Sequence, residues 1–198
     1  MSDPLRLVLL SGSFEGLTED TTTILRDYLA ARLVVSQQVV QWPSPSQEVN
    51  LQPADEAEVL LVFAAGVAAS AAELDRIRSY CAAGGAVVAI RCAGGAFAGW
   101  PGFEREVLGG QVRVGGADPA SYQVDFGQER TAHCLLEGME PFEAFGAPPR
   151  QVLLDGNVEI VAESPSSTGR VPLAWARQQG GGRVFATTLG HPRDFWEY

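Results

Sequence analysis

The first half of the chain alternates short apolar runs with longer segments of mixed polarity. The runs at Leu5–Leu10, Glu58–Ala64 and Ala86–Ile90 have the length and composition of buried strands, and Leu33–Gln41 is a further β-rich segment. Apolar residues recur at helical spacing over Thr18–Ala31, which predicts a helix. Strands that alternate with helices and are almost wholly apolar predict a parallel sheet covered on both faces.

A second helix is predicted over Ala71–Ala83, where capping signals stand at both ends. Ser70 is the expected N-cap and Glu73, three residues later, the expected partner of a capping box. Gly84-Gly85 gives the glycine signal of a helix C-terminus. Ligands of such sheets bind beyond the carboxyl ends of the strands. We therefore expect the segments that follow three of these strands to meet in space: Ser11-Gly12, Ala65-Gly66 and Arg91-Cys92.

The second half of the chain has shorter β-like segments separated by turn residues. A hairpin is predicted from Val171–Arg177 and Arg183–Thr188, which are joined by the glycine-rich Gln178–Gly182. This half is interpreted as an antiparallel extension of the sheet, and one domain is expected over residues 1–198. The other predicted strands are Val112–Val114, Tyr122–Phe126, Gln151–Leu154 and Glu159–Ala162.

Composition and charge narrow the classes of partner. The formal net charge is −10, all 14 basic residues are arginine, and they form no cluster. Because nucleic-acid binding depends on neutralising phosphates, neither nucleic acid nor an anionic membrane is an expected partner. Cys81, Cys92 and Cys134 have neither disulfide-framework nor zinc-site spacing. No signal peptide or membrane span is recognised, so a cytoplasmic location is expected.

Two stretches resemble the ThuA-like (trehalose utilisation) family. One is GGAVVAIRCAGGAFAGWPGFEREVLGG at 84–110, and the more specific is VPLAWARQQGGGRVFATTLGH at 171–191. His133–Met139 resembles a shorter element that lies between them in the family. The resemblance implies an α/β, flavodoxin-like fold of the class I glutamine amidotransferase-like type. In the family a final helix usually follows the position of Phe195, and this sequence does not show it.

The resemblance also points to a strand-end site in which the inherited chemistry is altered. Class I glutamine amidotransferases carry a cysteine on the turn after the fourth strand; here that position is Arg91, and Cys92 comes one residue late. The histidine of those enzymes corresponds to His191, but Arg193 stands where their glutamate is. Glutaminase activity is therefore not expected, because such catalysis needs a base oriented by an acid.

The three candidate catalytic residues each have a structural alternative. His191 is a candidate acid/base because its ordinary pKa lies near neutrality, or else a half-buried histidine bonded to a loop. Arg91 is a candidate anchor for carboxylate, phosphate or sugar hydroxyls, or else part of a buried ion pair with Asp125 or Glu104. Cys92 is a candidate reactive thiol if its pKa is lowered, or else an inert buried cysteine.

The remaining candidates are placed at the pocket as substrate-binding residues. Ser11, Gly12, Phe14 and Gly66 are placed by topology alone, and their glycines are also explained by the turns. Trp100 is a candidate aromatic wall, whereas core packing is the simpler account of Trp175. His133 is either part of the site or a structural residue. No metal and no cofactor are expected; Gly115-Gly116 replaces a Gly-His common in the family.

The leading hypothesis is thus a ThuA-like enzyme or enzyme-like protein of carbohydrate metabolism, a hydrolase or lyase if it is an enzyme. His191 would act as acid/base and Arg91 as anchor for a small molecule such as a sugar. One alternative is a catalytically degenerate amidotransferase-like domain that binds a small molecule or a partner. A weaker alternative is a Cys92-dependent hydrolase. A homodimer is a further option.

Overall fold

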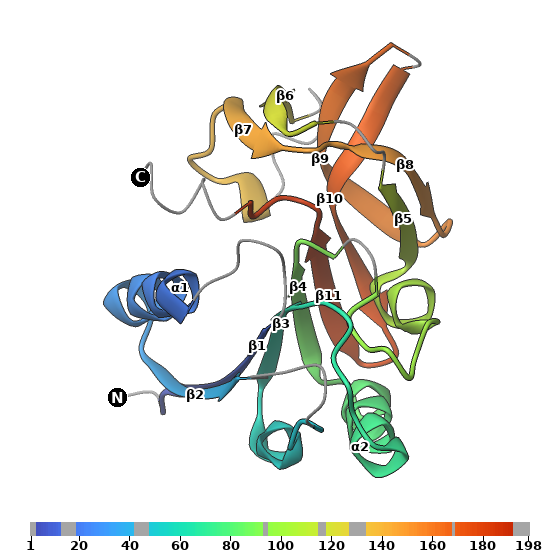
Figure 1. Ribbon diagram of the computed structural model, residues 1–198. Helices are drawn as coiled ribbons and strands as arrows, with labels where there is room; N and C mark the ends of the chain where they lie inside the picture. Colours follow the sequence, from blue (N-terminus) through green and yellow to red (C-terminus); the bar gives the residue numbers. More distant parts are fainter. Residues whose placement is uncertain are drawn as a thin grey trace.

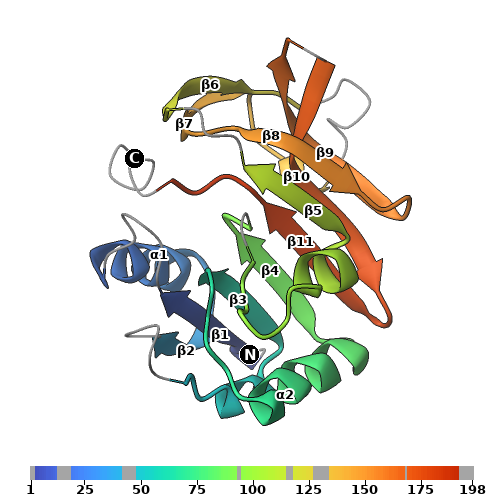
Figure 2. The ribbon, with the colours of Figure 1, turned by 45° about the vertical axis from the view of Figure 1, so that its right-hand side comes forward.

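The computed structural model describes residues 3–12, 19–41, 48–92, 95–114, 118–126, 134–167 and 169–191. Its main element is a seven-stranded sheet in the order β2-β1-β3-β4-β11-β10-β9. The first five strands in that order are parallel, and β10 runs antiparallel to both β11 and β9 (Figures 1 and 2). Their bounds are β1 Leu5–Gly12, β2 Val35–Gln41, β3 Val59–Ala64, β4 Ala86–Ile90, β9 Val158–Ser166, β10 Gly169–Gln179 and β11 Gly182–Thr187.

Alternate residues of β1 pack on opposite faces of the sheet, as the period of two in a strand requires. Leu7 and Leu9 pack with Leu25 of helix α1 (Glu19–Arg32). Val8 and Leu10 belong instead to the core that includes helix α2 (Ala71–Ala82). The sheet is therefore covered by helices on both faces, and the predicted flavodoxin-like α/β fold is confirmed. None of the helices in the described segments is long and apolar enough to span a bilayer.

Helix α2 has the predicted N-cap but only half of the predicted capping box. The Ser70 hydroxyl accepts a hydrogen bond from the backbone N–H of Glu73 at 3.3 Å. The Glu73 carboxylate does not return this bond; it accepts the backbone N–H of Leu51 at 2.5 Å and so holds the segment before the 3₁₀-helix η1 (Gln52–Glu56). The helix ends as expected, because Gly84 takes the left-handed φ of 91°.

The glycine-rich turns that lead into β4 and β11 pack against each other. A Cβ on Gly182 would lie 2.6 Å from the Gly85 oxygen, and one on Gly84 would lie 3.0 Å from the Gly181 carbonyl carbon. The β10–β11 turn and the α2–β4 turn therefore approach more closely than side chains would allow. These glycines serve packing between β4 and β11, which are neighbours in the sheet.

The second half contains two small sheets besides the antiparallel strands of the main sheet. Strand β5 (Gly110–Val114) pairs with β8 (Pro149–Leu154), and β6 (Ala120–Val124) pairs with β7 (Phe142–Gly146). The expected antiparallel extension is thus present in β9 and β10, whereas the other short strands pair separately. Strand β7 was not predicted, because Pro141 and the run Gly146–Pro149 break its pattern into a short segment.

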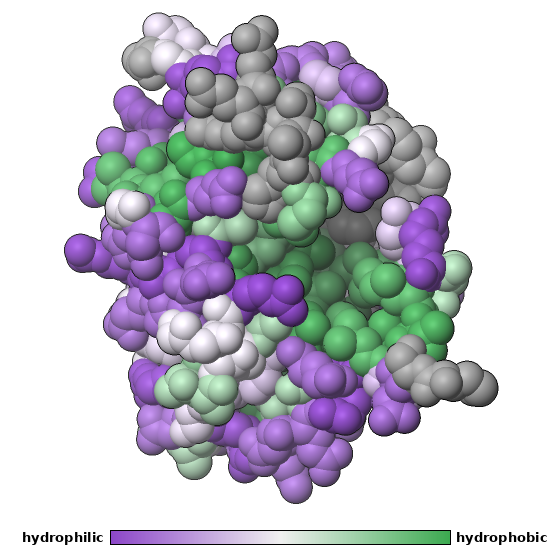
Figure 3. All heavy atoms as spheres, turned by 180° about the vertical axis from the view of Figure 1, so that it is seen from behind, coloured by the Kyte–Doolittle hydropathy of each residue, from purple (hydrophilic) through white to green (hydrophobic). Residues whose placement is uncertain are grey.

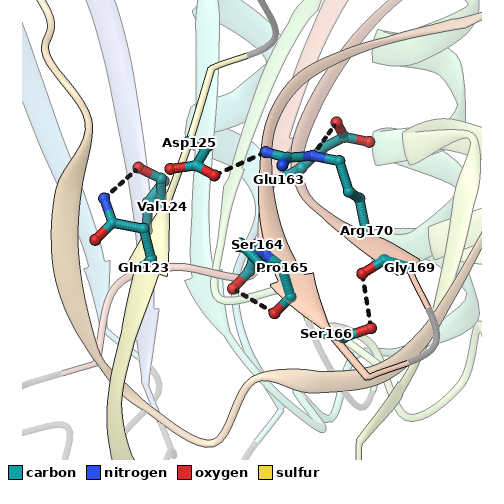
Figure 4. A network of polar contacts seen from close by, with 9 residues as sticks. All are labelled: Gln123, Val124, Asp125, Glu163, Ser164, Pro165, Ser166, Gly169 and Arg170. Atoms are coloured by element: carbon teal, nitrogen blue, oxygen red, sulfur yellow. Dashed lines mark hydrogen bonds and ion pairs between the residues drawn. The ribbon is translucent and has the colours of Figure 1, made fainter.

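A polar network joins the end of β6 to the main sheet. Asp125 and Glu163 exchange two backbone hydrogen bonds of 2.8 and 3.0 Å. The Arg170 guanidinium bonds the Asp125 carboxylate at 2.9 Å and the Glu163 carboxylate at 3.2 Å (Figure 4). These bonds raise the pKa of Arg170, because they favour its charged form. The network fixes β6 and β7 beside β9, above the strand ends.

Candidate functional site

The turn after β4 has an unusual backbone conformation. Arg91 is the only non-glycine residue of the described segments with a positive φ, at 54°. That conformation is uncommon for a side chain with a Cβ and persists only where the surroundings impose it. The surroundings here are the end of β11: the Arg91 N–H donates to the Leu189 oxygen and the Cys92 N–H to the Thr187 oxygen, both at 3.0 Å. Arg91 therefore stands on a strained strand-end elbow, the backbone position at which hydrolases of similar topology carry their nucleophile.

The same pair of hydrogen bonds brings His191 into the neighbourhood of the elbow. Leu189 holds the Arg91 backbone and lies two residues before His191, which follows β11 through Gly190. The imidazole of His191 and the Phe145 ring form a T-shaped pair, with centroids 5.1 Å apart and planes at 73°. Phe145 belongs to β7, so the small β6–β7 sheet forms one side of the histidine's environment. The sequence does not point to Phe145 as a site residue, because strand β7 could not be predicted from it.

Cys92 is placed where a reactive thiol is disfavoured. Burial raises the pKa of its thiol far above the ordinary range, and the negative charge of Glu104 raises it further. The Cys92 thiol is thus held in its neutral form, which is a poor nucleophile. Cys81 of α2 is buried, which raises its pKa to about 11, whereas Cys92 is half-buried and Cys134 is exposed.

A buried carboxylate stands beside the elbow on the α2 side of the sheet. Glu104 begins the π-helix η2 (Glu104–Leu108) and is 8% exposed. Its Oε1 accepts the Ala96 N–H at 2.8 Å, while the Gly66 N–H donates to the Gly95 oxygen at 2.7 Å. Glu104 thus fixes the loop after the elbow against the end of β3. The sequence offers Glu104 only as a buried ion-pair partner for Arg91, because no local pattern indicates that its carboxylate accepts the Ala96 N–H.

The candidates that were placed by topology lie at the strand ends and differ in their exposure to solvent. Ser11 is 1% exposed and its hydroxyl shares a 2.5 Å hydrogen bond with that of Thr22 in α1. That bond ties the strand to the helix. Gly12 and Gly66 have positive φ values of 153° and 62°, and Gly66 is exposed with open space where a Cβ would lie. Phe14 and His133 lie outside the described residues.

Trp100 is placed in the core, where the residue is 5% exposed. It packs edge-on to Phe103 with centroids 5.3 Å apart, and its indole N–H donates to Glu106 at 2.9 Å. This placement disfavours the expected aromatic wall, and contact with a ligand stays a prediction. Trp175 is fully buried and donates its indole N–H to the Leu108 oxygen at 2.8 Å, so it is a packing residue.

Within the described segments, no three His, Cys, Asp or Glu side chains are grouped to hold a metal ion. The candidate chemical groups at the strand ends are a guanidinium on the elbow and an imidazole after β11. A guanidinium binds carboxylates, phosphates and hydroxyls through a planar fork of donors, and an imidazole can take or give a proton near neutral pH.

Comparison with known proteins agrees with this geometry. The sequence matches the family described as "ThuA: Trehalose utilisation" over residues 18–198. The fold resembles a ThuA-like protein from Parabacteroides merdae, with a TM-score of 0.72 and 19% identity over 95% of this chain and 80% of that one. No curated protein matches the sequence.

Two further solved structures share the fold at low identity. A glutamine amidotransferase from Thermotoga maritima has a TM-score of 0.60 and 13% identity over 97% of this chain and 80% of that one. A β-galactosidase from Rahnella sp. R3 has a TM-score of 0.64 and 14% identity over 96% of this chain, but only 30% of its own. Together, the sequence match, the parallel sheet and the elbow after β4 show that the chain belongs to the ThuA family and has a glutamine amidotransferase-like fold.

Proposed function

We propose that the strand-end site around Arg91 and His191 binds a small molecule of carbohydrate metabolism, with Arg91 as the anchor and His191 as acid/base. The observation that carries the proposal is the elbow. A strained backbone conformation is kept after β4 although the residue on it is an arginine. Strain of this kind costs about 1–3 kcal/mol and is found mainly at functional sites. The trehalose-utilisation description of the family supports the carbohydrate class.

A second candidate is binding without turnover, in a catalytically degenerate amidotransferase-like domain. The half-buried Cys92, whose raised pKa keeps its thiol neutral, and the arginine on the elbow favour it over glutamine hydrolysis. The same raised pKa speaks against a Cys92-dependent hydrolase. A cytoplasmic location remains part of the proposal.

The test is a thermal-stability screen of the wild-type protein against sugars, keto-sugars and amino acids, followed by variants. A ligand at 100 times its Kd stabilises the native state by about 2.7 kcal/mol, which is a clear rise in melting temperature. Arg91→Ala should weaken the ligand about 10- to 100-fold, because a hydrogen bond to a charged group contributes roughly 1.5–3 kcal/mol. Arg113→Ala, at an exposed position of β5, is the control and should change nothing.

Turnover of the ligand separates the two candidates. If the site is catalytic, His191→Ala should abolish turnover and keep the stabilisation by the ligand. Stabilisation without turnover in the wild type supports the binding module. A ligand whose effect is unchanged in both Arg91→Ala and His191→Ala would refute the site.

A further inference from the structure

One face of the sheet is left hollow beside the candidate site. A cavity of about 280 Å³ lies where β4, β11 and β10 meet on the side of the sheet that carries α1. Val88, Ile90, Ala174 and Phe185 line it from the sheet, which is its floor, and Phe142 and Met139 line it from outside the sheet. Figure 3 shows this side of the molecule, where hydrophobic side chains surround a hollow in the middle of the surface.

The lining of this cavity offers nothing for a polar occupant. Among the described residues that line it, the only polar side chain is that of Thr187. The Thr187 hydroxyl donates to the Leu173 oxygen at 3.1 Å and accepts the Leu189 N–H at 3.1 Å. A polar group placed inside would lose its bonds to water without replacement, so the cavity suits an apolar group.

The cavity ends where the site begins. Ile90 and Gly190 both line it, and the next residue after each is Arg91 and His191 respectively. The hydrogen bond from the Arg91 N–H to the Leu189 oxygen, another lining residue, holds the two segments together. A molecule that bound at Arg91 and His191 would therefore have the apolar cavity as its neighbour.

The other end of the cavity is open at the surface. A second, broader hollow of about 780 Å³ shares Val88, Leu135 and Phe185 with it and continues along β11. On the rim, Leu135 and Met139 are 46% and 47% exposed. Large apolar side chains that gather at the mouth of a cavity are typical of a site that receives apolar groups.

We propose that the ligand of the Arg91–His191 site is an amphiphile, with a hydroxylated head at these two residues and an alkyl or other apolar tail in the cavity. The inference rests on the proposed function for the head and on the continuity of site and cavity for the tail. Each methylene that leaves water for such a cavity tightens binding about fourfold.

Alkyl glucosides test both parts of the ligand. Methyl, butyl, hexyl and octyl β-D-glucoside are titrated into the full chain by calorimetry, below the concentration at which octyl glucoside forms micelles. The dissociation constant should fall by about fourfold for each methylene that enters the cavity, and by at least tenfold in total from methyl to octyl. Arg91→Ala should weaken all four glucosides by a similar factor.

Ala174→Leu should remove the dependence on chain length, because the larger side chain fills the floor of the cavity. Ala162, a second buried lining residue, allows Ala162→Leu to repeat the test if the first variant does not fold. The matched control is Ala176→Leu, on the same strand and facing the broader hollow, outside the cavity. It should bind octyl glucoside as the wild type does.

The outcomes separate the tail from the head. Binding that depends on Arg91 but not on chain length overturns the amphiphile and leaves the proposed function in place. A chain-length effect that survives both Arg91→Ala and Ala174→Leu shows nonspecific adsorption and also overturns it, as does the failure of every glucoside to bind. The sugar screen with Arg91→Ala judges the proposed function by itself.

The competing explanation for the exposed apolar rim is that a second copy of the chain covers the mouth of the cavity. If it covers this face, the wild type is a dimer by light scattering and Leu135→Glu makes it monomeric. Leu153→Glu, at a residue 44% exposed on β8, is the control and should leave the dimer intact. That result would overturn the amphiphile, because the mouth of the cavity would be closed by protein.

Discussion

The two faces of the sheet at β4 and β11 are built from alternate residues of the same strands but are filled differently. On the α2 face, Val87, Val184 and Ala186 are at most 3% exposed, and fully buried Trp175 packs with them. On the α1 face, Val88, Ile90 and Phe185 remain partly exposed around a cavity. Helix α1 packs on β1 and β3, and β11 and β10 lie farther along the sheet from it (Figures 1 and 2).

The contrast shows that an apolar strand does not by itself imply a packed neighbour on each side. Both faces of β4 are apolar, as a parallel sheet requires, yet only one is sealed by helices in the described structure. A sealed face stabilises the fold, whereas the open apolar face next to the strained elbow is the one that we propose for a ligand.

The largest expected difference concerns large-to-small substitutions. Trp175→Ala on the packed face should cost about 3–5 kcal/mol, because a cavity opens in a dense core and the indole hydrogen bond is lost. Phe185→Ala on the open face should cost about 1–2 kcal/mol, because that ring already borders empty space and is only partly buried. Urea unfolding of both variants measures the difference, and equal costs would contradict the contrast between the faces.

Alkaline pH should probe the packed face through Cys81. Its folded pKa of about 11 lies above the ordinary value of 9.0, so between these pH values the unfolded state releases a proton that the folded state keeps. Stability is therefore lost as pH rises through this window, by about 2–3 kcal/mol for this thiol.

The measurement is the free energy of unfolding at pH 8 and pH 11 in the wild type and in Cys81→Ala. The wild type should lose more stability over this range than the variant, because the other titrating groups are common to both. An equal loss of unfolding free energy in both proteins would mean that burial in the core does not raise the pKa of Cys81.

The smallest expected difference concerns small-to-large substitutions on paired strands. Ala186→Leu enters the packed face and should destabilise by about 1–3 kcal/mol through overpacking. Ala174→Leu enters the cavity and should stay within about 1 kcal/mol of the wild type. Thermal melts of the two variants measure the difference. An equal drop in melting temperature for Ala174→Leu and Ala186→Leu would show that the cavity has no room for a larger side chain.

Much of the parallel half followed from local pattern. Strand β4 has the predicted bounds, β3 and α2 differ from theirs by one residue, and Ser70 caps α2 as expected. Apolar runs, caps and glycine turns are properties of neighbouring residues, so a sequence displays them directly. The position of Arg91 at the end of β4 was likewise available from the sequence, because it depends only on where that strand stops.

Tertiary structure alone decided the direction of side chains and the covering of faces. It buried Trp100 with Phe103, placed Glu104 behind the elbow and set Phe145 against His191. It also left the α1 face of β4 and β11 hollow. Alternation along a strand states that two faces exist, but contacts between residues far apart in the chain determine which face is filled.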